Sequence, residues 1–204
     1  MRTEKPLQHE PTNRTRCSFE DLPRRLFLDS STLQRLESYG EYIYDGGSIE
    51  EHDRIWSIPC GFDNIEALRQ IMFVGQRACF ELVLSTNSFR EVEDSGRVSY
   101  LSWAYEVLGY WQGLLRNYAE HGVAPFSGRG EKLAQKLETP AFGYLSTKDA
   151  LLIRDALLLE CDAFITMDNK LAKNSGHIER ELGLKILSPS DYWELLIPWA
   201  ALYV

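Results

Sequence analysis

The chain has 204 residues, of which 44% are hydrophobic and 25% are charged, and its net charge at neutral pH is −8. This composition is typical of a globular domain with a substantial core, and the negative charge argues against a broad basic surface that holds nucleic acid through its phosphates. No run approaches the roughly 20 apolar residues of a membrane span, and the first residues lack the apolar region of a secretory signal. We therefore expect a cytoplasmic protein with no membrane segment.

The cysteines give no sign of a metal site or a disulfide framework. Cys17, Cys60, Cys79 and Cys161 are far apart, and no Cys-x-x-Cys pair or suitably spaced His accompanies them. We expect reduced, mostly buried thiols.

Polar and apolar stretches divide the chain into an arm and one domain. Residues 1–23 are polar and without periodicity, which predicts a flexible N-terminal arm. Residues 24–204 are predicted to form a single domain. Within it, residues 46–62 have mixed polarity with Gly and Pro, and we interpret them as an insertion or extended loop.

Four short apolar runs predict strands, and helical patterns separate them. The helices include one from Asp63, a long aromatic-rich one over Ser99–His121, and a nearly all-apolar one that begins around Asp149. Strands that alternate with helices predict an α/β fold with a mainly parallel sheet. The predicted strands are Arg25–Asp29, Phe80–Ser85, Ala163–Thr166 and Lys185–Leu187.

Acidic residues recur where these strands end. Asp29 ends the first strand, Glu91 lies in the helix after the second, and Asp168 follows the third, while Asp149 opens the helix that leads to it. Parallel sheets place ligand sites at the carboxyl ends of their strands, so these acids are expected at one edge. Crowded carboxylates repel unless a cation compensates them, and oxygen ligands suit Mg²⁺ or Mn²⁺. Such a cluster indicates phosphoryl chemistry.

Three of the four acids also have a structural interpretation. Asp149 and Glu91 fit capping boxes with Ser146 and Ser88, and Asp168 is placed to cap the helix that follows it. These alternatives remain open for each residue taken singly.

Four segments together resemble the PIN-domain nucleases over Arg25–Leu196: LFLDSSTL, LVLSTNSFREV, KDALLIRDALLLECDAFITMDNKL and ILSPSDYWELL. The resemblance implies a three-layer α/β/α fold and a metal-dependent endoribonuclease that hydrolyses RNA phosphodiester bonds. It places the four catalytic, metal-binding acids on Asp29, Glu91, Asp149 and Asp168, with Thr166 in the family's Thr-x-Asp. Glu93 remains an alternative to Glu91 as the second acid. The chain is longer than the small toxin members, so the resemblance does not establish a toxin.

Several further residues are candidates for contact with RNA, which we expect to be single-stranded. Cations near the acids could hold phosphates, whereas Ser30 and Thr166 could contact phosphate, water or a carboxylate. Asp155 should face away from the acids, because six helical positions separate it from Asp149. The predicted substrate-binding residues are Ser30, Arg90, Lys148, Thr166 and Lys170; Lys173 follows one turn later.

The remaining features concern partners. The aromatic residues of the long helix (Tyr100, Trp103, Tyr105, Tyr110 and Trp111) favour a core or a homodimer surface over base stacking. An antitoxin-like regulatory protein is a further partner that the family resemblance suggests.

Two rival functions stay open. One is an aspartyl-phosphate-forming phosphatase or phosphotransfer domain with Asp29 as nucleophile, although Ser31 stands where that chemistry wants a second Asp. The other is a non-catalytic PIN-like scaffold that binds RNA or protein.

Overall fold

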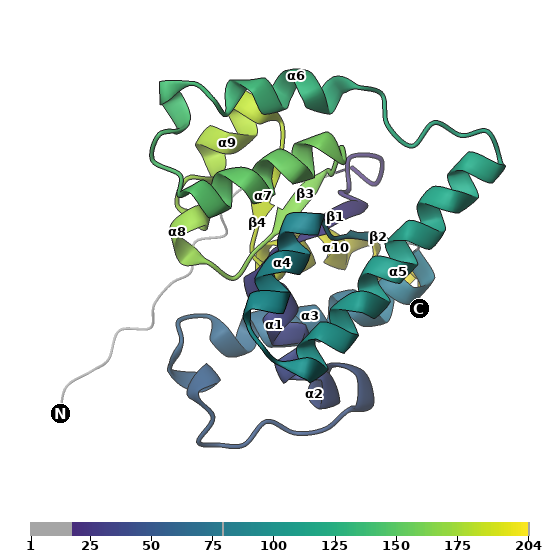
Figure 1. The fold of residues 1–204 in the computed structure, drawn as a ribbon. Helices are drawn as coiled ribbons and strands as arrows, with labels where there is room; N and C mark the ends of the chain where they lie inside the picture. Colours follow the sequence, from purple (N-terminus) through teal and green to yellow (C-terminus); the bar gives the residue numbers. More distant parts are fainter. Residues whose placement is uncertain (1–17, 79, 204) are drawn as a thin grey trace.

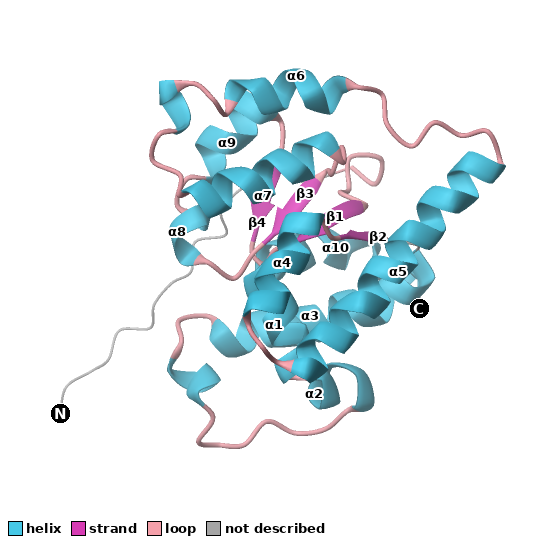
Figure 2. Ribbon diagram, viewed as in Figure 1, coloured by secondary structure: helices cyan, strands magenta, loops and turns pink. Residues whose placement is uncertain are grey.

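A four-stranded, all-parallel sheet forms the centre of the molecule (Figure 2). The computed structural model describes residues 18–78 and 80–203. The strand order is β2-β1-β3-β4, so the first and third strands of the chain are neighbours in the middle. The strands are β1 (Arg25–Leu28), β2 (Glu81–Val83), β3 (Ala163–Ile165) and β4 (Lys185–Leu187). The predicted α/β class and parallel sheet are confirmed.

The strands are apolar on both faces, which requires a helical layer on each. Leu26, Leu28 and Ile165 contribute to one hydrophobic core. Phe27 and Phe164 contribute to the other and stack with ring centroids 5.1 Å apart. This alternation produces three α/β/α layers, as expected.

Helices cover the two faces as separate groups (Figure 1). The first core takes side chains from α1 (Ser30–Ser38), α2 (Gly40–Asp45), α3 (Gly61–Ala78), α4 (Thr86–Asp94) and α10 (Pro189–Ala200). The second takes them from α6 (Arg129–Lys136), α7 (Thr147–Leu158), α8 (Asn169–Ala172) and α9 (Ser175–Leu182). The long helix α5 (Val98–Glu120) contributes to both. Short 3₁₀ helices are η1 (Arg54–Ser57), η2 (Pro140–Phe142) and η3 (Ala201–Tyr203).

Some helix boundaries differ from the sequence-based expectation. The helical pattern after Ser30 is divided at Tyr39, whose backbone leaves the helical region just before Gly40, a poor helix former. The helix expected from Asp63 begins earlier, at Gly61. The segment after Asp168 forms two helices, because the chain turns at Asn174.

Parts of the predicted arm and insertion pack onto the domain. Residues 1–17 of the arm lie outside the described residues, but Leu22 is buried, and the Tyr192 hydroxyl donates a 2.8 Å hydrogen bond to the Pro23 carbonyl. Within the insertion, the side chain of Ile55 is buried, and Asp53 accepts hydrogen bonds from the Tyr39 hydroxyl and the Ile55 N–H.

Two further predictions concern the state of the cysteines and membrane-spanning helices. Cys60 is exposed and Cys161 is buried, and both are free thiols; Cys17 and Cys79 lie outside the described residues. Among residues 18–78 and 80–203, no helix has the length and apolar character needed to cross a bilayer.

One glycine allows α6 to approach α7 closely. Gly130 is buried in the first turn of α6, and a Cβ atom there would lie 2.0 Å from the backbone oxygen of Leu157. Backbone atoms cannot move aside as a flexible side chain can, so any side chain at this position must separate the two helices.

We expect Gly130→Ala to destabilise the domain by about 2–3 kcal/mol, because the added methyl group forces α6 away from α7. Gly113→Ala is the matched control: Gly113 lies within α5 with open space around its Cβ position, so alanine there should raise stability by about 0.5–1 kcal/mol. Urea unfolding of both variants measures the difference. Equal stability of Gly130→Ala and the wild type would contradict the close approach.

Candidate active site

One cleft of about 440 Å³ at the carboxyl edge of the sheet is lined by all four predicted acids. Asp29 follows β1 directly, and Asp168 lies between β3 and α8. Glu91 reaches the cleft from α4, and Asp149 from the first turn of α7. Four segments that are far apart in the sequence therefore deliver carboxylates to one place.

The pairing of β1 with β3 fixes Asp29. The backbone N–H of Asp29 donates to the Ile165 carbonyl at 3.1 Å, which extends the strand pairing by one residue. Its Oδ2 atom accepts hydrogen bonds from the hydroxyls of Ser31 (2.6 Å) and Thr166 (2.8 Å). Only 8% of Asp29 is exposed, so these donors hold a nearly buried carboxylate in a defined orientation.

Thr166 links two of the acids. Its hydroxyl donates to Asp29 and accepts a 3.0 Å hydrogen bond from the backbone N–H of Asp168. Thr166 is only 1% exposed and lies beneath the cleft, outside the set of residues that line it. Its position suits orientation of the carboxylates, whereas the expected contact with substrate is not seen in this geometry.

Glu91 and Asp168 differ in whether they cap a helix. The predicted capping box between Ser88 and Glu91 is wrong: α4 is capped by Ser85, and Ser88 fills the third helical position. Glu91 therefore has no capping role. The capping prediction for Asp168 is confirmed, because its Oδ1 accepts a 2.7 Å hydrogen bond from the Lys170 N–H.

Asp149 retains part of its predicted cap. Ser146 Oγ accepts from the Asp149 N–H at 3.1 Å and donates to Asp149 Oδ2 at 2.7 Å. The Asp149 side chain thus engages the Ser146 hydroxyl, and it also lines the cleft. Glu93 and Asp94 are exposed and do not line it, which favours Glu91 as the second acid.

Four carboxylates and the two lysines Lys148 and Lys170 line the cleft, so its net charge is negative. Burial raises the pKa of Asp29; the hydroxyls of Ser31 and Thr166 oppose that rise, and the charge of Glu91 adds to it. Burial also raises the pKa of Tyr100, and the charges of Asp29 and Glu91 raise it further. Within the part of the chain that the structure describes, none of the four carboxylates forms an ion pair.

These residues fit a hard divalent cation in their chemistry. The donors are carboxylate and hydroxyl oxygens, which Mg²⁺ and Mn²⁺ prefer, and a cation would offset the unpaired charge around the nearly buried Asp29. Among the described residues, however, no three acidic, His or Cys side chains are already gathered as a metal-binding group. Mg²⁺ usually keeps several waters and takes only one or two protein carboxylates, so a gathered set of three is not a requirement for it.

Of the other residues predicted to contact the substrate, some line the cleft and others lie outside it. Ser30, Lys148 and Lys170 line the cleft. Arg90 and Lys173 are exposed outside it, and one Arg90 nitrogen donates to the Asn87 side chain at 3.4 Å.

Asp155 and the residues of the aromatic helix do not line the acidic cleft. Asp155 Oδ2 accepts a 2.9 Å hydrogen bond from the Asn87 amide and does not line the cleft, as expected from its position on the helix. On α5, Tyr100 and Trp111 are buried, and Tyr110 is half exposed. No residue of α5 lines the acidic cleft.

The lining residues that sequence reasoning missed include Tyr144 and Asn174. Tyr144 lies in the turn before α7 and Asn174 between α8 and α9. Neither stands at a strand end, which was the signal that located the acids. Tyr144 contacts the ring of His177 on α9, so its position depends on a tertiary contact, and the Asn174 amide donates to the Lys170 carbonyl at 3.3 Å.

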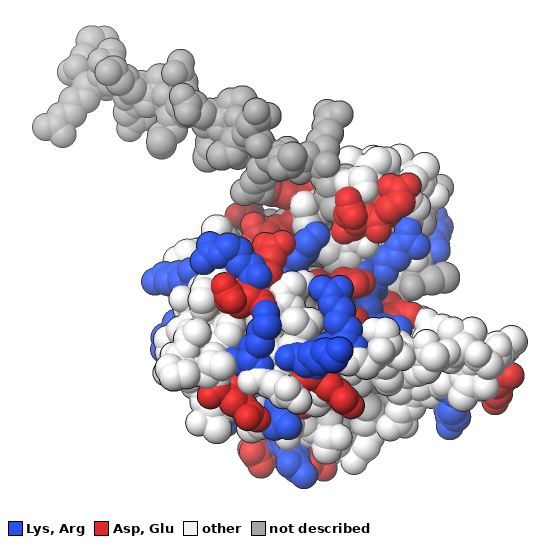
Figure 3. Space-filling model, turned by 90° about the horizontal axis from the view of Figure 1, so that it is seen from above, with Lys and Arg blue, Asp and Glu red and all other residues white. Residues whose placement is uncertain are grey.

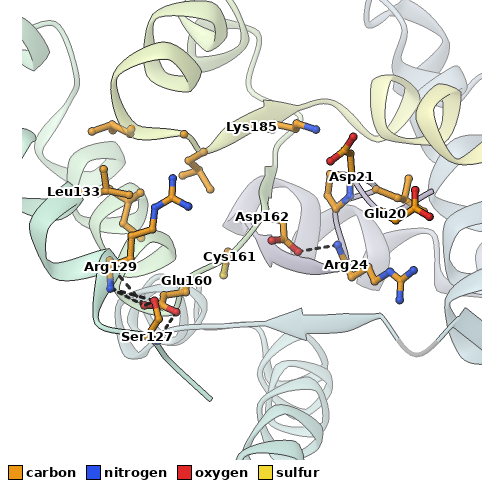
Figure 4. Close-up of a pocket in the computed structure, with 17 residues that line it drawn as sticks. Glu20, Asp21, Arg24, Ser127, Arg129, Leu133, Glu160, Cys161, Asp162 and Lys185 are labelled. Atoms are coloured by element: carbon orange, nitrogen blue, oxygen red, sulfur yellow. Dashed lines mark hydrogen bonds between the residues drawn. The ribbon is translucent and has the colours of Figure 1, made fainter. Parts of the chain in front are cut away.

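A second cleft, of about 540 Å³, lies at the opposite, amino-terminal edge of the strands (Figure 4). Two of the acids that line it already accept from the backbone: Asp162 accepts from the N–H groups of Arg24 and Arg25, and Glu160 accepts from the Ser127 N–H. Parallel sheets bind ligands at the other edge. We therefore place the candidate active site in the acidic cleft.

Surface charge agrees with this choice. On the side that carries α6 and α9, Lys and Arg are interspersed with Asp and Glu (Figure 3). No broad basic surface competes with the cleft on that face.

Comparison of the chain with protein-family models, with curated proteins and with solved structures finds no match. The arguments for function therefore rest on the geometry of the cleft.

We expect Thr166→Val to lower the free energy of unfolding by about 1–3 kcal/mol, because valine keeps the shape but leaves the Asp168 N–H without its acceptor and Asp29 with one donor fewer. Thr166→Ser keeps the hydroxyl and should lose less. Chemical denaturation of the three proteins measures the order. If valine proves as stable as threonine, the hydroxyl does not hold the two acids.

Proposed function

We propose that this chain is a divalent-metal-dependent ribonuclease of the PIN-domain kind, which hydrolyses RNA phosphodiester bonds in the acidic cleft. The observation that carries the proposal is the convergence of Asp29, Glu91, Asp149 and Asp168 on one cleft at the carboxyl edge of a parallel sheet. The alternative in which each acid serves only its own helix does not account for Glu91, which caps nothing.

The four carboxylates would hold one or two Mg²⁺ or Mn²⁺ ions. When bound, such an ion neutralises phosphate charge and makes water a stronger nucleophile at neutral pH. The support for a cation is that four carboxylates without ion pairs line the cleft and would repel the phosphate of a substrate.

The residues of the chain have distinct roles in this proposal. Ser31 and Thr166 keep Asp29 in one orientation, so that the carboxylate does not reorient when charge changes nearby. Lys148 and Lys170 line the same cleft and supply positive charge for the phosphates on either side of the reacting one. Ser30 adds a hydroxyl at the first turn of α1.

Purified protein should cut single-stranded RNA in the presence of Mn²⁺ and should stop when a chelator is added. We expect Asp149→Asn and Glu91→Gln each to lower the cleavage rate by about a hundredfold or more, because each removes a negative ligand. Glu93→Gln is the matched control, since Glu93 is exposed outside the cleft on the same helix and should cleave at the wild-type rate. Gel analysis of end-labelled RNA measures these rates. Cleavage that needs no metal and survives Asp149→Asn would refute the mechanism.

Binding of the ion can be tested without RNA. Mn²⁺ at about 100 times its dissociation constant should stabilise the folded state by about 2.7 kcal/mol, which raises the melting temperature by several degrees. Asp29→Asn should remove most of this shift. Glu93→Gln should retain it. Differential scanning calorimetry gives the result, and an equal shift in all three proteins would place the ion elsewhere.

A second candidate is a non-catalytic scaffold that binds RNA without metal. The observation that favours it is that no three acidic side chains of the described chain are gathered beforehand as a metal-binding group. It predicts no Mn²⁺-dependent shift in melting temperature and RNA affinity that Asp29→Ala leaves unchanged. The phosphotransfer alternative is less well supported, since Ser31 donates to Asp29 from the position where a second acid would be needed.

A further inference from the structure

An exposed aromatic ring lies among the charged residues of the acidic cleft. Tyr144 follows η2 and precedes α7, it lines the cleft, and 45% of its surface is exposed. The nearby Phe142, in contrast, is 5% exposed and belongs to the second core. A ring that is half open at a polar cleft has a face available to a ligand.

Two other rings support Tyr144 from behind. Its ring centroid lies 6.3 Å from that of Phe142 and 5.9 Å from that of His177, and the latter two rings are 5.1 Å apart. Phe142 is anchored in the core and His177 on α9, so the position of Tyr144 is set before a ligand arrives. A preformed aromatic surface loses little conformational freedom on binding.

The charges around this ring suit a nucleic-acid strand. Lys148 and Lys170 line the same cleft, and within the described chain neither ammonium group makes a hydrogen bond or an ion pair. Stacking on an aromatic face and phosphate neutralisation are the two interactions that hold single strands without regard to sequence. In a duplex the faces of the bases are already stacked on each other, so an aromatic platform takes an unpaired base.

We propose that Tyr144 stacks on an unpaired nucleobase of the strand held in the acidic cleft, and that this contact makes the site selective for single-stranded over double-stranded RNA. The inference rests on the proposed RNA-cleaving function, whose substrate it specifies. It assigns recognition of the base to the turn before α7 and of the phosphates to Lys148 and Lys170.

The test is equilibrium binding of fluorescent oligoribonucleotides in the presence of Mn²⁺, on the Asp149→Asn background so that the RNA stays intact. Tyr144→Leu removes the aromatic face but keeps an apolar side chain against Phe142 and His177, and Tyr144→Phe keeps the face. Tyr110→Leu is the matched control, because Tyr110 is 52% exposed on α5, outside the acidic cleft. Thermal unfolding confirms that each variant folds.

Tyr144→Leu should weaken binding of single-stranded RNA by about tenfold or more, the range found when a stacking ring is removed. Tyr144→Phe and Tyr110→Leu should bind as the parent does, and binding of duplex RNA should not change. An oligomer with abasic sites should bind equally to the parent and to Tyr144→Leu, because it has no base to stack. Unchanged single-strand affinity in Tyr144→Leu, or an equal loss with abasic RNA, overturns the proposal.

Failure of the nuclease proposal gives a different pattern. A wild-type chain that binds single strands through Tyr144 but never cuts them refutes the nuclease and leaves the stacking contact standing. A chain that cuts RNA and whose Tyr144→Leu variant has an unchanged KM refutes the stacking contact alone. Absence of any RNA binding refutes both.

Discussion

The parallel pairing of β1 with β3 is the constraint on which the candidate site depends. Leu28 lies opposite Ile165, so the two residues that follow, Asp29 and Thr166, leave the sheet side by side. One hydroxyl then reaches Asp29 and the backbone of Asp168 together. Because side chains alternate along a strand, a slip of one residue in this pairing would send the Thr166 hydroxyl to the other face of the sheet. Its hydrogen bonds to Asp29 and Asp168 would then be lost. In the observed register Phe27 lies opposite Phe164, and their stacked rings pack together in the second core.

The same arrangement carries an electrostatic cost. A carboxylate that is 8% exposed and faces another acid destabilises the folded chain unless hydrogen bonds or a cation compensate it. Two hydroxyls compensate part of this cost for Asp29, and the remainder is what a divalent ion would relieve. The same excess negative charge would therefore both attract the ion and destabilise the folded chain when the ion is absent. A site of this kind is expected to be less stable than a site of neutral residues in the same fold.

The strands and three of the acids could be predicted from the sequence, because both depend on local signals. Each strand is a short apolar run, Asp29 and Asp168 stand at the ends of such runs, and Asp149 stands at the start of the largely apolar helix α7. The start of α4 could not be located in this way. Ser85, Ser88 and other polar residues are all possible caps, and in the structure Ser85 is the cap.

Tyr144 could not be predicted from local signals, because its position depends on ring contacts with Phe142 and with His177, which lies on a helix later in the chain. Arg90 is next to Glu91 in sequence, yet a helix turns adjacent side chains about 100° apart, and it lies outside the cleft.

The division of the molecule into two cores has a consequence for the width of the cleft. Glu91 is carried by α4, whose apolar side chains belong to the core on one side of the sheet, whereas Asp149 is carried by α7, which belongs to the other. The two walls are thus anchored in different cores, and the Asn87–Asp155 hydrogen bond joins them across the gap. The two helices also contact each other directly, so a wider or narrower cleft would have to break both this hydrogen bond and that contact. The width of the cleft is therefore set where two separately anchored helices meet, and part of that contact is a polar bond that water can replace.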